Sequence, residues 1–128
     1  MRDSSMKESV THRPWGWYKV LSSEPDTYQV KILCVEKGKR ISLQKHFKRS
    51  ETWTTIRGNP LITLQDPMRV CAPKVFTLKP NETKHIPAEW VHRIEAPSSD
   101  ILILEFQFGK CDEEDIFRFE DDYNRVEK

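Results

Sequence analysis

Hydrophobic and polar residues alternate in short runs along most of this chain, and turn residues separate the runs. In the clearest run, Tyr28, Val30, Ile32 and Cys34 fall on every second position. A period of two is typical of a β-strand. Further strands are predicted over residues 41–45, 51–57, 61–64, 75–78, 84–87, 90–95 and 101–108. Many short strands joined by turns indicate an all-β sandwich or barrel.

The longest apolar run, ILILEFQF at residues 101–108, predicts a central strand that is buried on both faces. Glu105 interrupts this run and would share a face with Ile101, Ile103 and Gln107. A carboxylate inside a barrel is costly unless it is paired or bound to a cation. The alternative is a charge at a strand end that pairs with an arginine.

The two ends of the chain are predicted to differ from the strand-rich middle. Residues 1–11 are polar and are expected to form a disordered tail, which leaves 12–128 as a single domain. The aromatic residues after this tail are expected to pack on the core, and the alternative is that Arg13 and Trp15 line a ligand pocket. The C-terminal segment is expected to be a short helical or irregular tail.

Composition narrows the class of protein. A chain of 128 residues is long enough for one domain with a core. The formal net charge of +1, with basic and acidic residues interleaved, argues against a nucleic-acid partner. Nothing in the sequence approaches a membrane span. Three widely spaced cysteines and no CxxC pair favour a reduced, cytoplasmic protein without a thiolate zinc site.

A candidate metal site lies between Gly38 and Gly58. Gln44 and His46 are two apart on a predicted strand, so they share a face, and Glu51 can join them after a turn. An amide oxygen, an imidazole and a carboxylate are ligands that a borderline divalent cation accepts. His92 follows the corner at Pro87 and would supply a fourth ligand.

The spacing of these two segments resembles the paired motifs of the cupin superfamily. The first motif, G-x5-HxH-x4-E-x6-G, has glutamine in place of its first histidine here. The second, G-x5-PxG-x2-H-x3-N, keeps its proline and histidine. The matching positions are Gly38, Gln44, His46, Glu51 and Gly58, then Asn81, Pro87, Glu89, His92 and Ala96. The resemblance implies a double-stranded β-helix, that is, a jelly-roll barrel.

A narrower resemblance covers nearly the whole chain from residue 13. The segments RPWGWYKVL, GKRISLQKHFKRSETW, IPAEWVHRIEAP and DEEDIFRFEDDYNR are similar to the C-terminal phosphomannose isomerase domain of bifunctional type II enzymes. Those enzymes join this cupin to a mannose-1-phosphate guanylyltransferase. The resemblance implies a stand-alone isomerase that interconverts mannose 6-phosphate and fructose 6-phosphate through an enediol. It also implies a divalent metal, most often Zn²⁺, with Mn²⁺, Co²⁺, Ni²⁺ or Fe²⁺ as alternatives.

The same resemblance suggests roles for charged residues. Arg49 and Arg118 would bind the phosphate of the sugar phosphate, and Glu105 and Arg125 would be catalytic. Glu105, His85 and Glu120 are the candidates for the base. As the alternative, Arg118 and Arg125 would pair on the surface with the acidic residues 120–122.

Several positions depart from the family pattern and keep a second function open. Phe47, Lys48 and Thr52 replace histidines that the family often carries, and Glu89 replaces a glycine. These changes favour a non-catalytic cupin that binds a metal or sugar, as the partner of a separate nucleotidyltransferase. A third hypothesis is a metal dioxygenase, and Gln44 argues against it because cupin dioxygenases usually bind iron with more histidines. By analogy with cupins, we also expect a homodimer.

Overall fold

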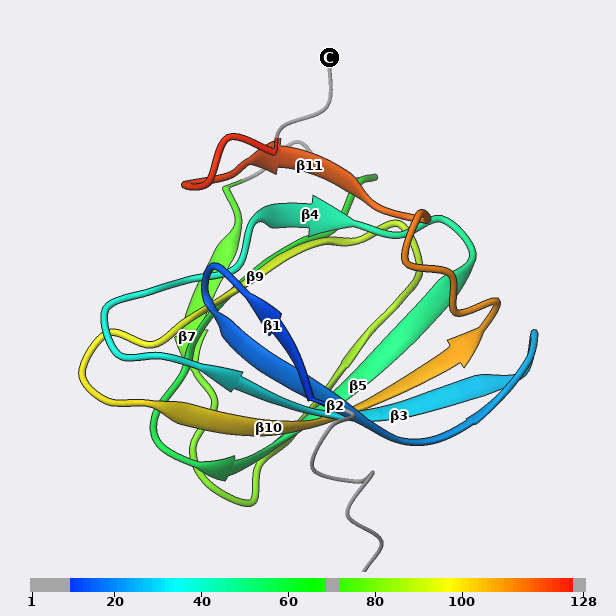
Figure 1. The fold of residues 1–128 in the computed structure, drawn as a ribbon. Helices are drawn as coiled ribbons and strands as arrows, with labels where there is room; N and C mark the ends of the chain where they lie inside the picture. Colours follow the sequence, from blue (N-terminus) through cyan, green and yellow to red (C-terminus); the bar gives the residue numbers. More distant parts are fainter. Residues whose placement is uncertain (1–9, 69–71, 126–128) are drawn as a thin grey trace, which may run out of the picture.

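The computed structural model describes residues 10–68 and 72–125, and every regular element within them is a β-strand. The predicted all-β class is therefore confirmed (Figure 1). In chain order the strands are β1 (Val10–Arg13), β2 (Gly16–Glu24), β3 (Tyr28–Val35), β4 (Leu43–Lys45), β5 (Arg49–Arg57), β6 (Leu61–Gln65), β7 (Lys74–Thr77), β8 (Thr83–Ile86), β9 (Val91–Glu95), β10 (Ile101–Gly109) and β11 (Phe117–Glu120).

The strands form two antiparallel sheets that face one another (Figure 1). One sheet has the order β1-β2-β3-β10-β5-β8, and the other has the order β11-β4-β9-β6-β7. Many neighbouring strands are distant in sequence, as in jelly rolls. Trp53, Ile62, Ile94 and Ile103 are completely buried. Apolar side chains from both sheets therefore build one core.

Strand β10 is central in its sheet, between β3 and β5, as its apolar sequence predicts. Ile101, Ile103, Glu105 and Gln107 are buried, whereas the residues between them are half-buried or exposed, and Phe108 is 48% exposed. The prediction that both faces of this strand are buried is therefore wrong for one face. An antiparallel sheet commonly packs one face on the core and leaves the other near solvent.

The structure changes the predictions for both ends of the chain. Val10 and Thr11, which we expected in a disordered tail, belong to β1, and residues 1–9 of that expected tail lie outside the described residues. The C-terminal segment is irregular over residues 110–116, as one form of the prediction allowed. It then forms β11 beside β4, so the helical form is wrong (Figure 1). The described residues contain no helix that could cross a membrane.

Two glycines of the first motif have nearly the same backbone conformation and different surroundings. Gly38 has φ +81° and Gly58 has φ +87°, both in the left-handed region that glycine favours. A Cβ at Gly58 would lie 2.7 Å from Ile101 Cγ2 and 2.8 Å from Asp100 O, whereas one at Gly38 would meet nothing within 4 Å. Of these two glycines, only Gly58 must also lack a side chain, because its neighbours pack where a Cβ would lie.

This difference predicts unequal effects of alanine at the two glycines. Both variants lose about 1–2 kcal/mol through backbone strain. Gly58→Ala should lose about 1–3 kcal/mol more, because its methyl group overpacks the contact with Ile101. Urea denaturation of both variants measures the difference, and equal losses would contradict the close approach at Gly58.

Candidate metal centre

Two strand pairs, one in each sheet, bring the predicted ligands into the interior. Strand β4 pairs with β9, and Gln44 lies opposite His92. Strand β5 pairs with β10, and Glu51 lies opposite Gln107. Residues directly opposite in an antiparallel pair project from the same face of their sheet. His46 directly follows β4, where the chain crosses to β5 in the other sheet.

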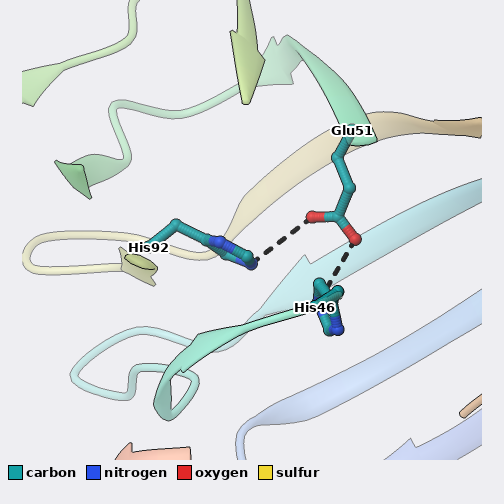
Figure 2. Close-up of side chains that lie close together, drawn as sticks. All are labelled: His46, Glu51 and His92. Carbon is teal, nitrogen blue, oxygen red and sulfur yellow. Dashed lines mark ion pairs between the residues drawn. The ribbon is translucent and has the colours of Figure 1, made fainter. Parts of the chain in front are cut away.

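His46, Glu51 and His92 meet in the interior and form what we call the His-Glu-His cluster. Their exposed fractions are 3%, 2% and 1%. His46 Nε2 lies 3.4 Å from Glu51 Oε2, and His92 Nε2 lies 3.4 Å from Glu51 Oε1 (Figure 2). One ligand atom from each residue lies within 4.8 Å of the others. Two imidazoles and a carboxylate at this spacing can hold a divalent cation.

Backbone carbonyl groups fix the orientation of both imidazoles. His46 Nδ1 donates to the carbonyl oxygen of Asp115 at 2.6 Å, and His92 Nδ1 donates to that of Trp90 at 2.9 Å. A carbonyl oxygen only accepts, so the proton of each neutral ring is on Nδ1. Each Nε2 therefore presents its lone pair to the cluster, as a metal ligand requires.

The charges in the cluster also suit a cation. Burial opposes the charge of Glu51, but His46, His92 and Arg49 outweigh it and lower the pKa of Glu51 to about 2. Burial lowers the pKa of His46 to about 4, and it also lowers the pKa of His92. At neutral pH the cluster therefore has one carboxylate and two neutral imidazoles, the protonation state in which these groups bind metals.

Two buried atoms of the cluster have no hydrogen-bond partner among the described residues. They are Glu51 Oε1 and His92 Nε2, which lie 3.4 Å apart. Both atoms carry lone pairs, so they cannot satisfy each other, and a cation between them would satisfy both. The residues present therefore fit a divalent cation.

Gln44 borders the cluster with its amide nitrogen rather than its oxygen. Its Nε2 lies 3.2 Å from His46 Nε2, and its Oε1 accepts a hydrogen bond from Ser42 Oγ at 2.6 Å. Only the oxygen of an amide can bind a cation, so Gln44 would become a ligand with its amide turned over. The role of Gln44 as a metal ligand stays a prediction.

A cavity of about 80 Å³ adjoins the cluster and is lined by the four predicted ligands. A water molecule occupies about 30 Å³ in the liquid, so the cavity has room for a cation with one or two waters. Sites for organic ligands usually measure about 300–1,000 Å³. A sugar phosphate could enter only if side chains of the cavity wall moved.

The sequence matches a known protein family. The sequence profile described as "Mannose-6-phosphate isomerase C-terminal" matches residues 1–121. The chain belongs to this family. The resemblance carried by the two ligand segments and by the RPWG and RFED motifs is thereby confirmed.

Curated relatives include longer biosynthetic proteins. Alginate biosynthesis protein AlgA of Pseudomonas aeruginosa is 36% identical over 127 residues, which is 98% of this chain and 25% of the relative. A mannose-1-phosphate guanylyltransferase of Sinorhizobium fredii is 37% identical over 112 residues, covering 86% of this chain and 20% of the relative. The chain thus spans about a quarter or less of the length of these relatives.

Solved structures support the predicted cupin jelly roll. Oxalate decarboxylase from Bacillus subtilis superposes with a TM-score of 0.77 at 14% identity, covering 89% of this chain and 31% of that chain. The capsular polysaccharide assembling protein CapF from Staphylococcus aureus gives 0.75 at 17% identity, with coverages of 87% and 34%. KdgF from Halomonas sp. gives 0.70 at 14% identity, with coverages of 82% and 91%. At these identities the likeness concerns the fold.

The structure separates the three candidate bases. Glu105 is 5% exposed and lines the cavity, where its carboxyl group accepts hydrogen bonds from Trp53 Nε1 and Gln107 Nε2. It is therefore an interior group and not a charge at a strand end. His85 lies exposed on edge strand β8 and contacts Thr52, and Glu120 is exposed and pairs with Arg93.

The three predicted arginines all line the cavity, in different situations. Arg49 is buried and donates to Glu51 Oε2, to His46 Nε2 and to the carbonyl oxygen of Asp112. Arg125 forms a two-point ion pair with Asp121, at 2.8 and 3.0 Å, so the alternative was right about an acidic partner, but the Asp121 side chain is buried and not on the surface. Arg118 is half-buried on β11. Phosphate binding by Arg49 and Arg118, and a catalytic role of Arg125, stay predictions.

Two departures from the cupin motif leave the backbone in the conformation that glycine favours. Asn81 and Glu89 stand where the motif has glycine, and they have φ values of +71° and +70°, which non-glycine residues seldom adopt. The backbone N–H of Glu89 donates to the carbonyl oxygen of His46 at 2.7 Å. The corner before His92 therefore stays joined to the residue that follows β4.

The sequence did not reveal several residues of the site. Lys31 is 4% exposed and lines the cavity, and the carboxylate of Asp115 accepts hydrogen bonds from the backbone N–H groups of Phe47 and Lys48. On β3 the buried positions are Lys31, Leu33, Cys34 and Val35, and Lys31 shares its face with Leu33 and Val35. The spacing of Lys31 from Leu33 and Val35 could have indicated that Lys31 faces the interior. The apolar side chains at 28, 30 and 32 instead suggested that the other face of the strand is the buried one.

The cluster predicts which histidine a bound metal needs. His92→Ala should lose stoichiometric Zn²⁺, because it removes one of two imidazole ligands. His85→Ala should keep it, because His85 is exposed and outside the cavity. Metal content after dialysis, measured by mass spectrometry, tests both variants. A metal-replete His92→Ala protein would disprove the assignment of the centre.

Glu105 predicts a pH dependence of stability in the metal-free protein. Burial and the nearby charge of Glu51 raise the pKa of Glu105 to about 8, from 4.5. The folded state holds this proton more tightly than the unfolded state, so its contribution to stability falls as pH rises from 4.5 to 8.

We therefore compare the wild type with Glu105→Gln. One pKa unit corresponds to about 1.4 kcal/mol, and the glutamine variant should gain at least that much relative to the wild type between pH 5.5 and pH 8. Urea denaturation at the two pH values measures this change. The same stability difference at both would show that Glu105 does not hold its proton.

Proposed function

We propose that the chain is a metal-dependent aldose–ketose isomerase that interconverts mannose 6-phosphate and fructose 6-phosphate. Membership of the family supports the type of substrate. The observation that carries the proposal is the pair of partnerless atoms Glu51 Oε1 and His92 Nε2, buried within the His-Glu-His cluster. These atoms are oriented toward a cation that would lie beside Glu105 in one cavity. A homodimer stays part of the proposal.

His46, Glu51 and His92 would hold the cation, with Zn²⁺ as first choice, and the cation would stabilise negative charge on the sugar oxygens of an enediolate. The chain itself must move a proton between C1 and C2. Glu105 is the candidate base that lines the cavity, and its pKa of about 8 lets it both take up and release a proton near neutral pH.

Neighbouring side chains hold the Glu105 carboxyl group in one orientation. Trp53 Nε1 donates to Glu105 Oε2 at 3.0 Å, and Gln107 Nε2 donates to Glu105 Oε1 at 2.7 Å. Gln107 Nε2 also lies 3.3 Å from Glu51 Oε2. Gln107 thus links the proposed base, Glu105, to the proposed metal ligand, Glu51, and would hold the base at a fixed distance from the cation.

The volume of the cavity favours a second candidate, a module that binds a metal without turnover. About 80 Å³ admits a hydrated cation but not a hexose phosphate. The isomerase therefore requires movement of half-buried wall residues such as Arg13, Ile116 and Arg125. A binding module that partners a separate nucleotidyltransferase requires no such movement.

A coupled assay separates the two candidates. Protein loaded with Zn²⁺, Mn²⁺, Co²⁺ or Ni²⁺ receives mannose 6-phosphate, and formation of fructose 6-phosphate is followed. We expect metal-dependent turnover that falls at least about 100-fold in Glu105→Gln, since a positioned base contributes about 10²–10⁴-fold. His85→Ala should retain the wild-type rate. No turnover with any metal, in protein shown to bind it, would favour the binding module.

A further inference from the structure

A second group of polar side chains lies in the wall of the same cavity, formed by the N-terminal hairpin and β3. Lys31 on β3 is 5% exposed in its side chain, and its Nζ lies 4.2 Å from the centre of the Tyr18 ring. Arg13 donates to Tyr18 Oη at 3.4 Å. These three residues, which we call the Lys-Tyr-Arg group, come from β1, β2 and β3 and direct their donors to one place.

The carboxylate of Glu113 occupies that place. Glu113 Oε2 accepts from Lys31 Nζ at 2.9 Å, and Glu113 Oε1 accepts from Tyr18 Oη at 3.3 Å. Arg13 Nη2 lies 3.8 Å from Glu113 Oε1. A single anionic group thus satisfies all three side chains of the Lys-Tyr-Arg group.

Glu113 differs from its partners in how it reaches the site. It belongs to the irregular segment 110–116, and its side chain is 52% exposed, whereas that of Lys31 is 5% exposed. A buried ammonium group needs an anion, because burying it unpaired costs several kcal/mol. A half-exposed carboxylate can leave at little cost if another anion replaces it.

We propose that the Lys-Tyr-Arg group is the binding site for the phosphoryl group of a sugar phosphate, and that the Glu113 side chain is a built-in occupant that the phosphate displaces. The identity of the ligand rests on the proposed function. A phosphate dianion has more charge than a carboxylate and three terminal oxygens, so it can accept from the ammonium, the hydroxyl and the guanidinium groups together.

The other arginines of the cavity wall are less suited to this task. Arg49 donates to Glu51 Oε2 and to His46 Nε2, so its guanidinium group is already engaged within the His-Glu-His cluster. Arg125 has a two-point pair with Asp121. A phosphate at Arg49 or Arg125 would have to displace the carboxylate that the arginine already binds, and that carboxylate is buried. Displacement of Glu113 instead releases a carboxylate whose side chain is already 52% exposed.

The segment 110–116 is anchored on both sides of Glu113. The carbonyl oxygen of Asp112 accepts from Arg49 at 3.1 Å, and the carbonyl oxygen of Asp115 accepts from His46 Nδ1 at 2.6 Å. The carboxylate of Asp115 also holds the backbone of Phe47 and Lys48. Glu113 can therefore leave by rotation of its side chain, with the backbone beside the metal ligands unchanged.

Calorimetric titration of the full chain with inorganic phosphate tests this site, in buffers of constant ionic strength and first without added metal. Glu113→Gln should bind phosphate about tenfold more tightly, because the competing anion is gone and the free fraction of the site rises. Lys31→Met should bind it at least about tenfold more weakly, through loss of a charge-assisted hydrogen bond. Glu114→Gln, an exposed neighbour in the same segment, is the matched control and should not change.

Each outcome bears on the site separately from turnover. Unchanged phosphate affinity in both Glu113→Gln and Lys31→Met overturns the proposal, and so does a loss of affinity in Arg118→Gln alone, which would place the phosphate at Arg118. Because Glu113→Gln keeps Lys31 in place, misfolding of Lys31→Met leaves the test intact.

Mannose 6-phosphate, compared with mannose, then identifies the ligand. If binding of inorganic phosphate and of mannose 6-phosphate both need Lys31, but no metal supports isomerisation, the subsite stands and the isomerase fails. If the isomerase is active and the KM for mannose 6-phosphate is unchanged in both variants, the isomerase stands and the subsite fails.

Discussion

The buried carboxylate of Glu51 is the group around which the interior of this barrel is arranged. It is 2% exposed, Arg49 and Gln107 donate to its Oε2, and the Nε2 atoms of His46 and His92 lie 3.4 Å from its oxygens. A buried carboxylate keeps its charge only with a nearby positive charge and hydrogen-bond donors, which Arg49 and Gln107 supply. The two sheets must therefore close at a fixed separation, since the cluster residues come from β9 and the end of β4 on one side and from β5 on the other.

The segment 110–116 connects this interior to the surface. It returns from β10 to β11 and carries backbone acceptors for His46 and Arg49, together with the Asp115 carboxylate that shapes the turn after β4. The same segment places Glu113 on Lys31. One stretch of irregular chain thus orients His46 of the cluster and also places a carboxylate on Lys31, so these two parts of the cavity wall are physically linked.

Departures from the family pattern fall where the backbone tolerates them. Asn81 and Glu89 replace motif glycines and still have positive φ, a conformation that costs about 1–3 kcal/mol at a non-glycine residue and persists only where the surrounding structure imposes it. Phe47 is 49% exposed, and Lys45 Nζ lies 4.7 Å from the centre of its ring. The histidines that the family often carries at this point are thus replaced outside the buried cluster, which retains both imidazoles and the carboxylate.

The sequence by itself determined the strands from β3 to β10, the cupin fold and the three residues of the cluster. Alternation reports local backbone geometry, and the motif spacing reports where a strand must turn. Only the tertiary structure decided which residues meet across the barrel. It turned Lys31 inward and His85 outward, gave Glu105 its partners Trp53 and Gln107, and brought Glu113 from the C-terminal segment to Lys31, 82 positions away. Such contacts depend on the packing of one sheet on the other, and local periodicity carries no record of that packing.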